Sequence, residues 1–377
     1  MKVKGYDASR NNRRRPGSGR PANRHSKQLK IMLAALGVLV AGLIVVGVVI
    51  YGRLTSDDVT ALLVQTSTPN PADDADPSVS GIQTQPPEKE TISYHGKTYV
   101  KNDNIVNIVF LGIDSEAERG ALNHSDMMIV CAVDTVTKKA TLLTIPRDIW
   151  TDVSKIDTKT GKITKMIKQR LNTAYLFGGG PNKYGASNTK ACIQNFLERK
   201  NELETPLDFT LDIPVPFFVS IDMDGISKIA DAVGGIEVTL DTTIPDVGKK
   251  NEKITLKGHK AEDYLRDRHN TAGSDFGRTA RQRNFMVQLA KKIKSLGAVD
   301  LVTRLYEPFK TYGHTDLTID QAVAFAKLLS GMDIDAIEQL VIPCYPGKAG
   351  EDEKDVLFDD EAETLDMLLG IYYTEVP

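Results

Sequence analysis

The stretch IVNIVFLGID, residues Ile105–Asp114, is the strongest structural signal in this chain. It is almost continuously apolar and ends in glycine and aspartate, which predicts a buried strand with a polar end. Two more apolar runs follow, Met127–Asp134 and Lys139–Pro146, and the short Thr/Lys turn between them is typical of a hairpin. Because strands this apolar are usually buried on both faces, we expect helices to cover the sheet.

The remaining chain mixes helical and strand patterns. Helices are predicted over Asn188–Lys200, Ile226–Gly235, Gly277–Gly297 and Thr318–Met332. Further strands are predicted over Phe217–Gly225 and Ile236–Leu240. The mixture predicts an α/β domain, a central mixed β-sheet flanked by helices, over residues 92–377.

The N-terminal region differs in composition from the rest of the 377 residues. Residues 1–30 contain ten Lys/Arg and one acid, whereas residues 31–377 contain 37 basic and 49 acidic side chains. Between tail and domain, residues 31–52 carry no charge, and as a helix they would span about 33 Å. A cleaved signal peptide would have a shorter apolar region of about 7–15 residues, so we predict one retained transmembrane helix.

Charge also predicts the orientation in the cell membrane. The positive-inside rule makes residues 1–30 a basic cytoplasmic tail and residues 92–377 an extracellular domain. Residues 53–91 are rich in Pro, Thr and Asp and are predicted to be an extracellular spacer. A basic tail could instead bind nucleic acid, but the adjacent span already accounts for its charge, so no nucleic-acid partner is expected.

The three cysteines are too few for a disulfide framework. Cys131 lies in an apolar run and is predicted to be a buried small hydrophobe, while pairing of Cys192 with Cys344 stays open. The chain has no G-x-S-x-G, G-x-x-x-x-G-K-[ST] or H-E-x-x-H motif, and its histidines lack zinc-ligand spacing. The candidates for chemistry are therefore aspartates and arginines.

Two aspartates lie at strand ends. Asp114 closes the first strand and Asp126 directly precedes the next apolar run. If the two strands are neighbours, the carboxylates could converge on a hard cation such as Mg²⁺, which prefers one or two carboxylates plus substrate phosphates. The alternative is that both are turn formers or helix caps.

The arginines cluster in YLRDRHNTAGSDFGRTARQ, residues 264–282. In a helix beginning near Gly277, one stripe contains Arg278, Gln282, Phe285 and Leu289, so the two polar side chains are predicted to point inward. A buried guanidinium needs a carboxylate or a bound anion, and a helix N-terminus favours an anion. The other two arginines of this helix lie off the stripe and are predicted to be surface residues: Arg281 and Arg283.

Three further arginines could contact the same anion. Arg266 and Arg268, if extended, would point to one side about 6–7 Å apart, a spacing that suits two phosphates of a diphosphate. Arg147 follows a strand in the sequence IPRD. The alternative is a lattice of structural salt bridges.

These motifs, in this order, resemble those of the LytR–CpsA–Psr family. NIVFLGIDS, HSDMMIV, LLTIPRDIW, RLNTAYLFGG, DMDGISKIADAVGGIEV and YLRDRH with DFGRTARQ match the family's successive signatures. The resemblance covers about residues 104–347 together with the expected tail, span and exterior domain. Members are membrane-anchored enzymes of Gram-positive-type envelopes that move glycopolymers, such as teichoic acid or capsule, from a polyprenyl-diphosphate carrier to peptidoglycan.

The resemblance implies roles for individual residues. Asp114 and Asp126 would hold Mg²⁺, with Mn²⁺ as an alternative, and Asp275 would be the general base. The set that would bind the diphosphate is Arg147, Arg266, Arg268, Arg278 and Gln282. Of these, Arg147 and Arg278 would also act in catalysis by stabilising charge on the leaving group. One departure is His124, which replaces a permanent cation of the family with a group mostly neutral at pH 7.

The expected reaction is therefore phosphotransfer of a glycopolymer to a peptidoglycan hydroxyl, with release of polyprenyl phosphate. Attack by water would make the same site a lipid diphosphatase. The alternative from another class is a membrane-anchored protein that binds an envelope anion, or regulates, without catalysis.

Overall fold

The computed structural model describes residues 61–63, 91–114, 123–200, 209–222, 224–267, 275–296 and 298–377. The predicted tail (1–30) and membrane span (31–52), and most of the spacer, lie outside these residues. Among the residues described, none of the helices combines the length and apolar character needed to cross a bilayer.

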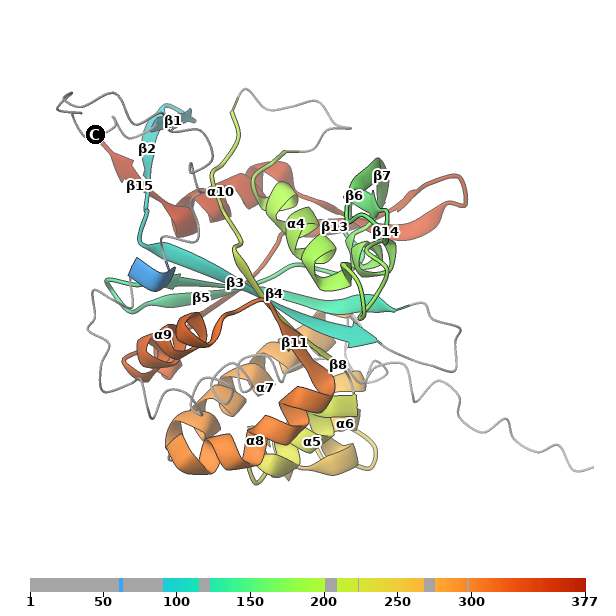
Figure 1. Ribbon diagram of the computed structural model, residues 1–377, viewed down its shortest axis with the longest axis vertical. Coiled ribbons are helices and arrows are strands. Elements are labelled where there is room, and N and C mark those ends of the chain that lie inside the picture. Colours follow the sequence, from blue (N-terminus) through green and yellow to red (C-terminus); the bar gives the residue numbers. More distant parts are fainter. Residues whose placement is uncertain are drawn as a thin grey trace, which may run out of the picture.

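A six-stranded sheet forms the centre of the domain (Figure 1). Its order is β11 (Gly313–Thr315), β8 (Phe217–Asp222), β3 (Ile105–Asp114), β4 (His124–Asp134), β5 (Ala140–Thr144) and β12 (Glu338–Val341). Strands β3, β4 and β5 run antiparallel in succession, whereas β8 and β12 pair in parallel with β3 and β5. The prediction of a central mixed sheet is confirmed.

Burial explains why these segments are strands. Nearly every residue of β4 and β8 is buried, so both faces of the sheet are covered. Figure 1 shows two of the helices on one side of the sheet, α4 (Gly185–Leu197) and α10 (Glu361–Tyr372). On the other side are α5 (Asp224–Ala232), α6 (Gly258–Arg266), α7 (Asp275–Ser295), α8 (Ala298–Tyr312) and α9 (Ile319–Ser330).

Four smaller sheets surround this core. They are formed by β1 (Thr91–Tyr94), β2 (Lys97–Lys101) and β15 (Tyr373–Val376), by β6 (Trp150–Ile156) and β7 (Ile163–Arg170), by β9 (Ile236–Thr239) and β10 (Lys253–Leu256), and by β13 (Cys344–Ala349) and β14 (Lys354–Asp359). The domain also contains the short helices η4 (Leu171–Thr173), α3 (Ala174–Phe177) and η5 (Ile334–Ala336). Because β15 pairs with β2, the C-terminal strand lies beside the first strands of the domain (Figure 1).

Most predicted elements are confirmed, with shifts at their ends. The predicted strand over 217–225 stops at Asp222, because Asp224 already begins α5. The four predicted helices correspond to α4, α5, α7 and α9. All three cysteines are free thiols, so Cys192 and Cys344 do not pair, and Cys131 is buried as expected.

Arg281 corrects the prediction that it lies on the surface. Its side chain is 1% exposed, because α7 is covered on a second side by α6 as well as on the side of the apolar stripe. Its Nε donates to Tyr264 O at 3.1 Å, and Nη2 donates to Asp267 O. These carbonyls lie at the C-terminal end of α6, where backbone acceptors lack partners within the helix. Arg281 therefore fixes the end of α6 against α7. Arg283, also predicted to be exposed, is only partly so.

We expect Arg281→Ala to lower the free energy of unfolding by about 1–3 kcal/mol, because buried carbonyls of α6 would lose their donor. Chemical denaturation of the variant measures this loss. Lys292→Ala, on the same helix, removes one positive charge and is expected to change stability by less than about 0.5 kcal/mol. Equal stability of the two variants would contradict the capping role.

Candidate functional site

A β-bulge places Asp126 at the edge of the candidate site. In the pairing of β3 with β4, Gly112 is opposite Met127 and Ile113 is opposite Ser125, which leaves Asp126 as the extra residue. The sequence-based expectation that Asp126 precedes the strand is wrong, because β4 pairing continues past the bulge to His124. Bulges of this kind redirect a side chain out of the regular alternation and are common beside active sites.

Asp114 and Asp126 come from neighbouring strands, which is the condition under which the sequence analysis expects their carboxylates to converge. The backbone of Asp114 ends β3 directly opposite His124, two residues from Asp126. The Asp114 side chain lies outside the described part of the structure. The antiparallel pairing of β3 with β4 brings the two positions to the same end of the sheet.

Asp126 forms a short ion pair with Arg147. Arg147 Nη1 donates to Asp126 Oδ2 at 2.7 Å, and the two side chains are 18% and 9% exposed. Such a charge-assisted hydrogen bond, largely shielded from water, holds both groups in a fixed orientation. The structure therefore brings together two residues that are 21 positions apart in the chain and were predicted separately.

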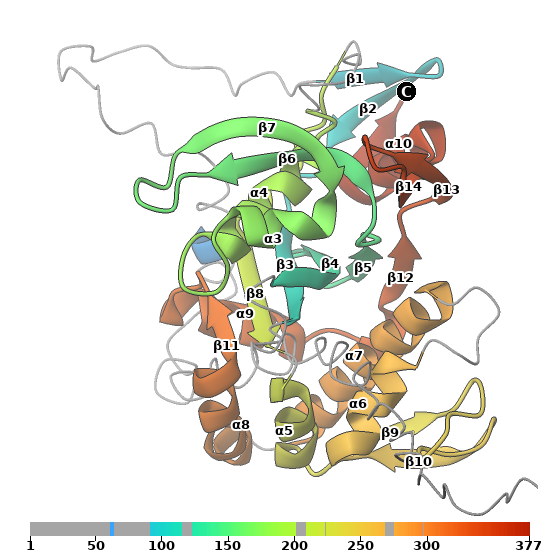
Figure 2. The same ribbon diagram turned by 90° about the vertical axis from the view of Figure 1, so that its right-hand side faces the viewer.

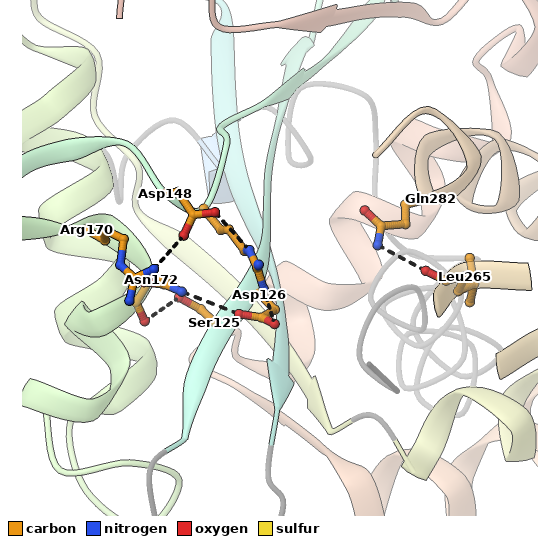
Figure 3. A network of polar contacts seen from close by, with 8 residues as sticks. Ser125, Asp126, Asp148, Arg170, Asn172, Leu265 and Gln282 are labelled. Atoms are coloured by element: carbon orange, nitrogen blue, oxygen red, sulfur yellow. Dashed lines mark hydrogen bonds and ion pairs between the residues drawn. The ribbon is translucent and has the colours of Figure 1, made fainter. Parts of the chain in front are cut away.

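Three further residues of this network were missed by sequence reasoning: Asp148, Arg170 and Asn172. Asp148 accepts from Arg147 Nε at 3.2 Å and from Arg170 Nη1 at 3.3 Å, so it links the two arginines (Figure 3). Asp148 belongs to the motif IPRD, and Arg170 and Asn172 belong to the motif RLN. Only Arg147 was selected from these two motifs. The signal that could have found Asp148 is its position between an arginine and the following strand.

Asn172 supports Asp126 from the other side. Its Nδ2 lies 3.5 Å from Asp126 Oδ1, and its carbonyl accepts from Ser125 Oγ at 3.4 Å (Figure 3). Burial lowers the pKa of the neighbouring His124, while Asp126 acts in the opposite direction and Arg170 lowers it further. His124 is thus neutral near pH 7, and the permanent positive charges on this side of the site belong to Arg147 and Arg170.

The stripe predicted on α7 is confirmed as a buried face. Arg278 and Gln282 are each 3% exposed, beside Phe285 and Leu289 at 1% and 0%. Gln282 Nε2 donates to Leu265 O at 3.4 Å, next to the last residue of α6 (Figure 3). Gln282 therefore has a structural contact of its own, in addition to any contact with a ligand.

Arg266 does not lie in an extended segment, and that prediction is wrong. It is the last residue of helix α6, because Ala261, Tyr264 and Leu265 form a buried face that continues the helix to this point. Its side chain, all of Arg268 and the side chain of Asp275 lie outside what the structure describes. The backbone of Asp275 begins α7.

Helix α7 also contacts the strand that leads to Arg147. Arg283 Nη1 donates to Thr144 Oγ1 at 3.4 Å, and Thr144 is the last residue of β5, three positions before Arg147. This contact holds helix α7 against the end of β5 from which Arg147 follows.

The donor set fits a hard cation better than zinc. The described residues contain no group of three or more His, Cys, Asp or Glu side chains able to hold a metal. A cation beside Asp126 would thus need ligands from a phosphate-bearing substrate and from Asp114. Asn172 Oδ1 is a buried oxygen without a hydrogen-bond donor among the described residues. One or two carboxylates plus phosphate oxygens is the arrangement that Mg²⁺ favours.

The domain thus has a mixed α/β fold, with a carboxylate–arginine site at one end of its central sheet. The chain matches the model of the LytR_cpsA_psr family over residues 75–368, so it belongs to that family.

Named relatives agree with this membership. The chain is 30% identical over 236 residues to the polyisoprenyl-teichoic acid–peptidoglycan teichoic acid transferase TagU of Enterococcus faecalis, covering 61% of this chain and 68% of the relative. It is 26% identical over 268 residues to the corresponding transferase TagV of Bacillus subtilis, covering 67% of this chain and 62% of the relative.

A solved structure shows the same fold. The crystal structure of protein gbs0355 from Streptococcus agalactiae aligns with a TM-score of 0.57 and 22% identity, over 71% of this chain and 86% of that chain.

Proposed function

We propose that this protein transfers a glycopolymer from a polyprenyl-diphosphate carrier to a hydroxyl of peptidoglycan and releases polyprenyl phosphate. The observation that carries the proposal is the Asp126–Arg147 ion pair, held at the sheet end where the backbone of Asp114 also lies. The names of the teichoic acid transferase relatives support the same substrate class.

In the proposed reaction, the oxygen of the acceptor hydroxyl attacks the phosphorus next to the polymer. A phosphodiester forms, the bond from this phosphorus to the bridging oxygen breaks, and polyprenyl phosphate leaves. Asp275, at the start of α7, would take the proton of the hydroxyl. Arg147, Arg266, Arg268, Arg278 and Gln282 would bind the diphosphate.

The arginines would supply most of the stabilisation of negative charge on the diphosphate. Arg147 is fixed by Asp126 and Asp148, so its guanidinium charge would act on a phosphate from a preset orientation. Arg278 is held on the buried face of α7, where a guanidinium interacts strongly with an anion because water is excluded. Mg²⁺ held by Asp114 and Asp126 would supply further neutralisation of the diphosphate.

The proposal includes the topology expected from the sequence. A single membrane span over residues 31–52, with the domain outside, would keep the site near a lipid-linked substrate. Two alternatives use the same residues: a lipid diphosphatase, in which water replaces the sugar hydroxyl, and a membrane-anchored protein that binds the anion without turnover.

Metal removal tests the proposed chemistry. The full-length protein in detergent should release polyprenyl phosphate from a lipid diphosphate substrate when Mg²⁺ is present. Chelation with EDTA should reduce the rate by at least about 100-fold, and added Mg²⁺ or Mn²⁺ should restore it. Full activity in EDTA would exclude the metal role, and no release under any condition would favour the protein that only binds.

A further inference from the structure

The hairpin of β6 and β7 is a basic ribbon in an otherwise acidic part of the chain. Residues 150–170 contain six Lys/Arg and two acids, whereas residues 31–377 contain 37 basic and 49 acidic side chains. Both acids of the hairpin are engaged, because Asp152 pairs with Lys168 at 3.1 Å and Asp157 accepts from the backbone N–H of Lys159 at 2.8 Å. The hairpin therefore keeps a net positive charge, with six Lys/Arg against two acids.

Two of these lysines lie directly opposite each other. Lys155 on β6 pairs in register with Lys165 on β7, an arrangement that is unfavourable because like charges face across the strands. Lys155 Nζ lies 4.8 Å from the centre of the Phe177 ring, which stabilises one of the two charges. Lys165 is exposed. A bound anion would remove the remaining repulsion.

The tip of the hairpin packs on the glycine-rich turn, residues 177–185. A methyl group at Gly161 would lie 3.0 Å from the Tyr184 ring, and one at Gly179 would lie 2.5 Å from Thr158. This contact places a lysine of the turn beside those of the hairpin. We call the exposed set the lysine ribbon: Lys159, Lys162, Lys165 and Lys183.

The lysine ribbon is available to an external ligand. In the part of the chain that the structure describes, none of its four ammonium groups lies within ion-pair distance of a carboxylate. Figure 2 shows β6 and β7 curving over α3 and α4, with the turn between them at the edge of the molecule. The lysine ribbon is therefore a group of exposed cations at this edge.

The root of the hairpin lies in the candidate site. Trp150 of β6 pairs with Arg170 of β7, and Arg170 donates to Asp148 in the network around Asp126. From Arg170, strand β7 extends about 23 Å to Ile163, near the tip. A polymer leaving the site along the hairpin would meet lysines at its far half.

We propose that the lysine ribbon binds the phosphodiester backbone of the polymer while its diphosphate end occupies the site. This inference rests on the proposed function and narrows its substrate class to polyanionic polymers such as teichoic acids. Exposed cations along the far half of a hairpin whose root lies in the site match an extended polyanion, whereas a neutral glycan would gain no electrostatic attraction.

A binding experiment tests the ribbon without turnover. The full-length protein in neutral detergent is titrated with soluble poly(glycerol phosphate) at several salt concentrations. The variant Lys159→Gln/Lys162→Gln/Lys165→Gln/Lys183→Gln is expected to bind at least about tenfold more weakly at low salt, with a shallower salt dependence. The matched control removes the same number of positive charges from exposed lysines of β9–β10 and α6, and it should bind as the unchanged protein does. Its substitutions are Lys249→Gln, Lys250→Gln, Lys257→Gln and Lys260→Gln.

Kinetics separate this inference from the proposed function. Two substrates are compared: a lipid diphosphate that carries a polyanionic polymer, and one that carries a short neutral saccharide. The increase in KM caused by the ribbon substitutions should be about tenfold larger for the first substrate than for the second. Equal changes for the two substrates, or equal binding by the ribbon and control variants, would overturn the inference while the transfer reaction stands. A loss of activity by the ribbon variant that appears only in vesicles rich in anionic lipid would assign the ribbon to binding of the membrane surface. This result would also overturn the inference. Absence of turnover by the unchanged protein would instead reject the proposed function.

Discussion

Arg278→Ala is expected to slow release of polyprenyl phosphate by about 100- to 1000-fold, the effect of losing one preorganised donor to a developing negative charge. Arg278 is 3% exposed near the N-terminus of α7, on the face that also carries Gln282 and the buried Phe285. In this water-excluded position its charge acts on the diphosphate through a low dielectric. The measurement is single-turnover release from a lipid diphosphate with saturating Mg²⁺.

A loss of folding must be separated from this catalytic effect. Circular dichroism and thermal unfolding of the Arg278→Ala variant should show a folded domain, and Lys292→Ala on the same helix should retain full activity. Guanidinium ion at a non-denaturing concentration should restore part of the rate to the Arg278→Ala variant, because it returns the missing cation. A folded variant with an unchanged rate would remove Arg278 from the site.

Asp126→Asn is expected to lower the rate by at least about 100-fold and to raise the Mg²⁺ concentration needed for half-maximal activity by about 10- to 100-fold. The substitution keeps the size of the side chain but removes the negative charge that the bulge presents beside Arg147. The site would lose a ligand for Mg²⁺ and the anchor of Arg147 together. Rates over a range of Mg²⁺ concentrations measure both effects.

Asp148→Asn is the matched control for this variant. Asp148 contacts Arg147 and Arg170 but is not proposed to touch the metal. We expect it to weaken substrate binding without changing the Mg²⁺ dependence. If Asp148→Asn shifts the Mg²⁺ requirement as far as Asp126→Asn does, the metal is not held by Asp126.

The central strands could be predicted from sequence because burial on both faces leaves an almost continuous apolar run. Ile105–Asp114 is a strand over its full predicted length. The register between strands was not predictable in the same way, since the bulge at Asp126 arises from how β3 and β4 pair. That bulge is what places the carboxylate at the site.

The helix stripe illustrates the limit of periodicity. The stripe correctly placed Arg278 and Gln282 inward, because their neighbours Phe285 and Leu289 must be buried. It could not show that α6 covers a second side of α7, so Arg281 was assigned to the surface although it caps α6. A pattern within one helix reports a single apolar face and not the number of elements packed around it.

The polar network was only partly predictable. Arg147 and Asp126 were each selected from a strand end, but their contact at 2.7 Å depends on the antiparallel pairing of β4 with β5. Asp148 and Asn172 were not selected, because Asp and Asn residues outside the strands are most often turn formers. Arg170 was not selected because it ends β7, a strand that the sequence analysis did not predict. Their role follows only from the distances that link them to Arg147 and Asp126.

The most direct test of the proposed transfer is the fate of the phosphorus next to the polymer. The full-length protein is supplied with Mg²⁺, peptidoglycan and a lipid diphosphate labelled at that phosphorus. We predict that one labelled phosphodiester forms on peptidoglycan for each polyprenyl phosphate released, and that Arg278→Ala and Asp126→Asn reduce both products in parallel. Polyprenyl phosphate released with the label on a free polymer monophosphate, and none on peptidoglycan, would contradict transfer and assign the site to diphosphate hydrolysis.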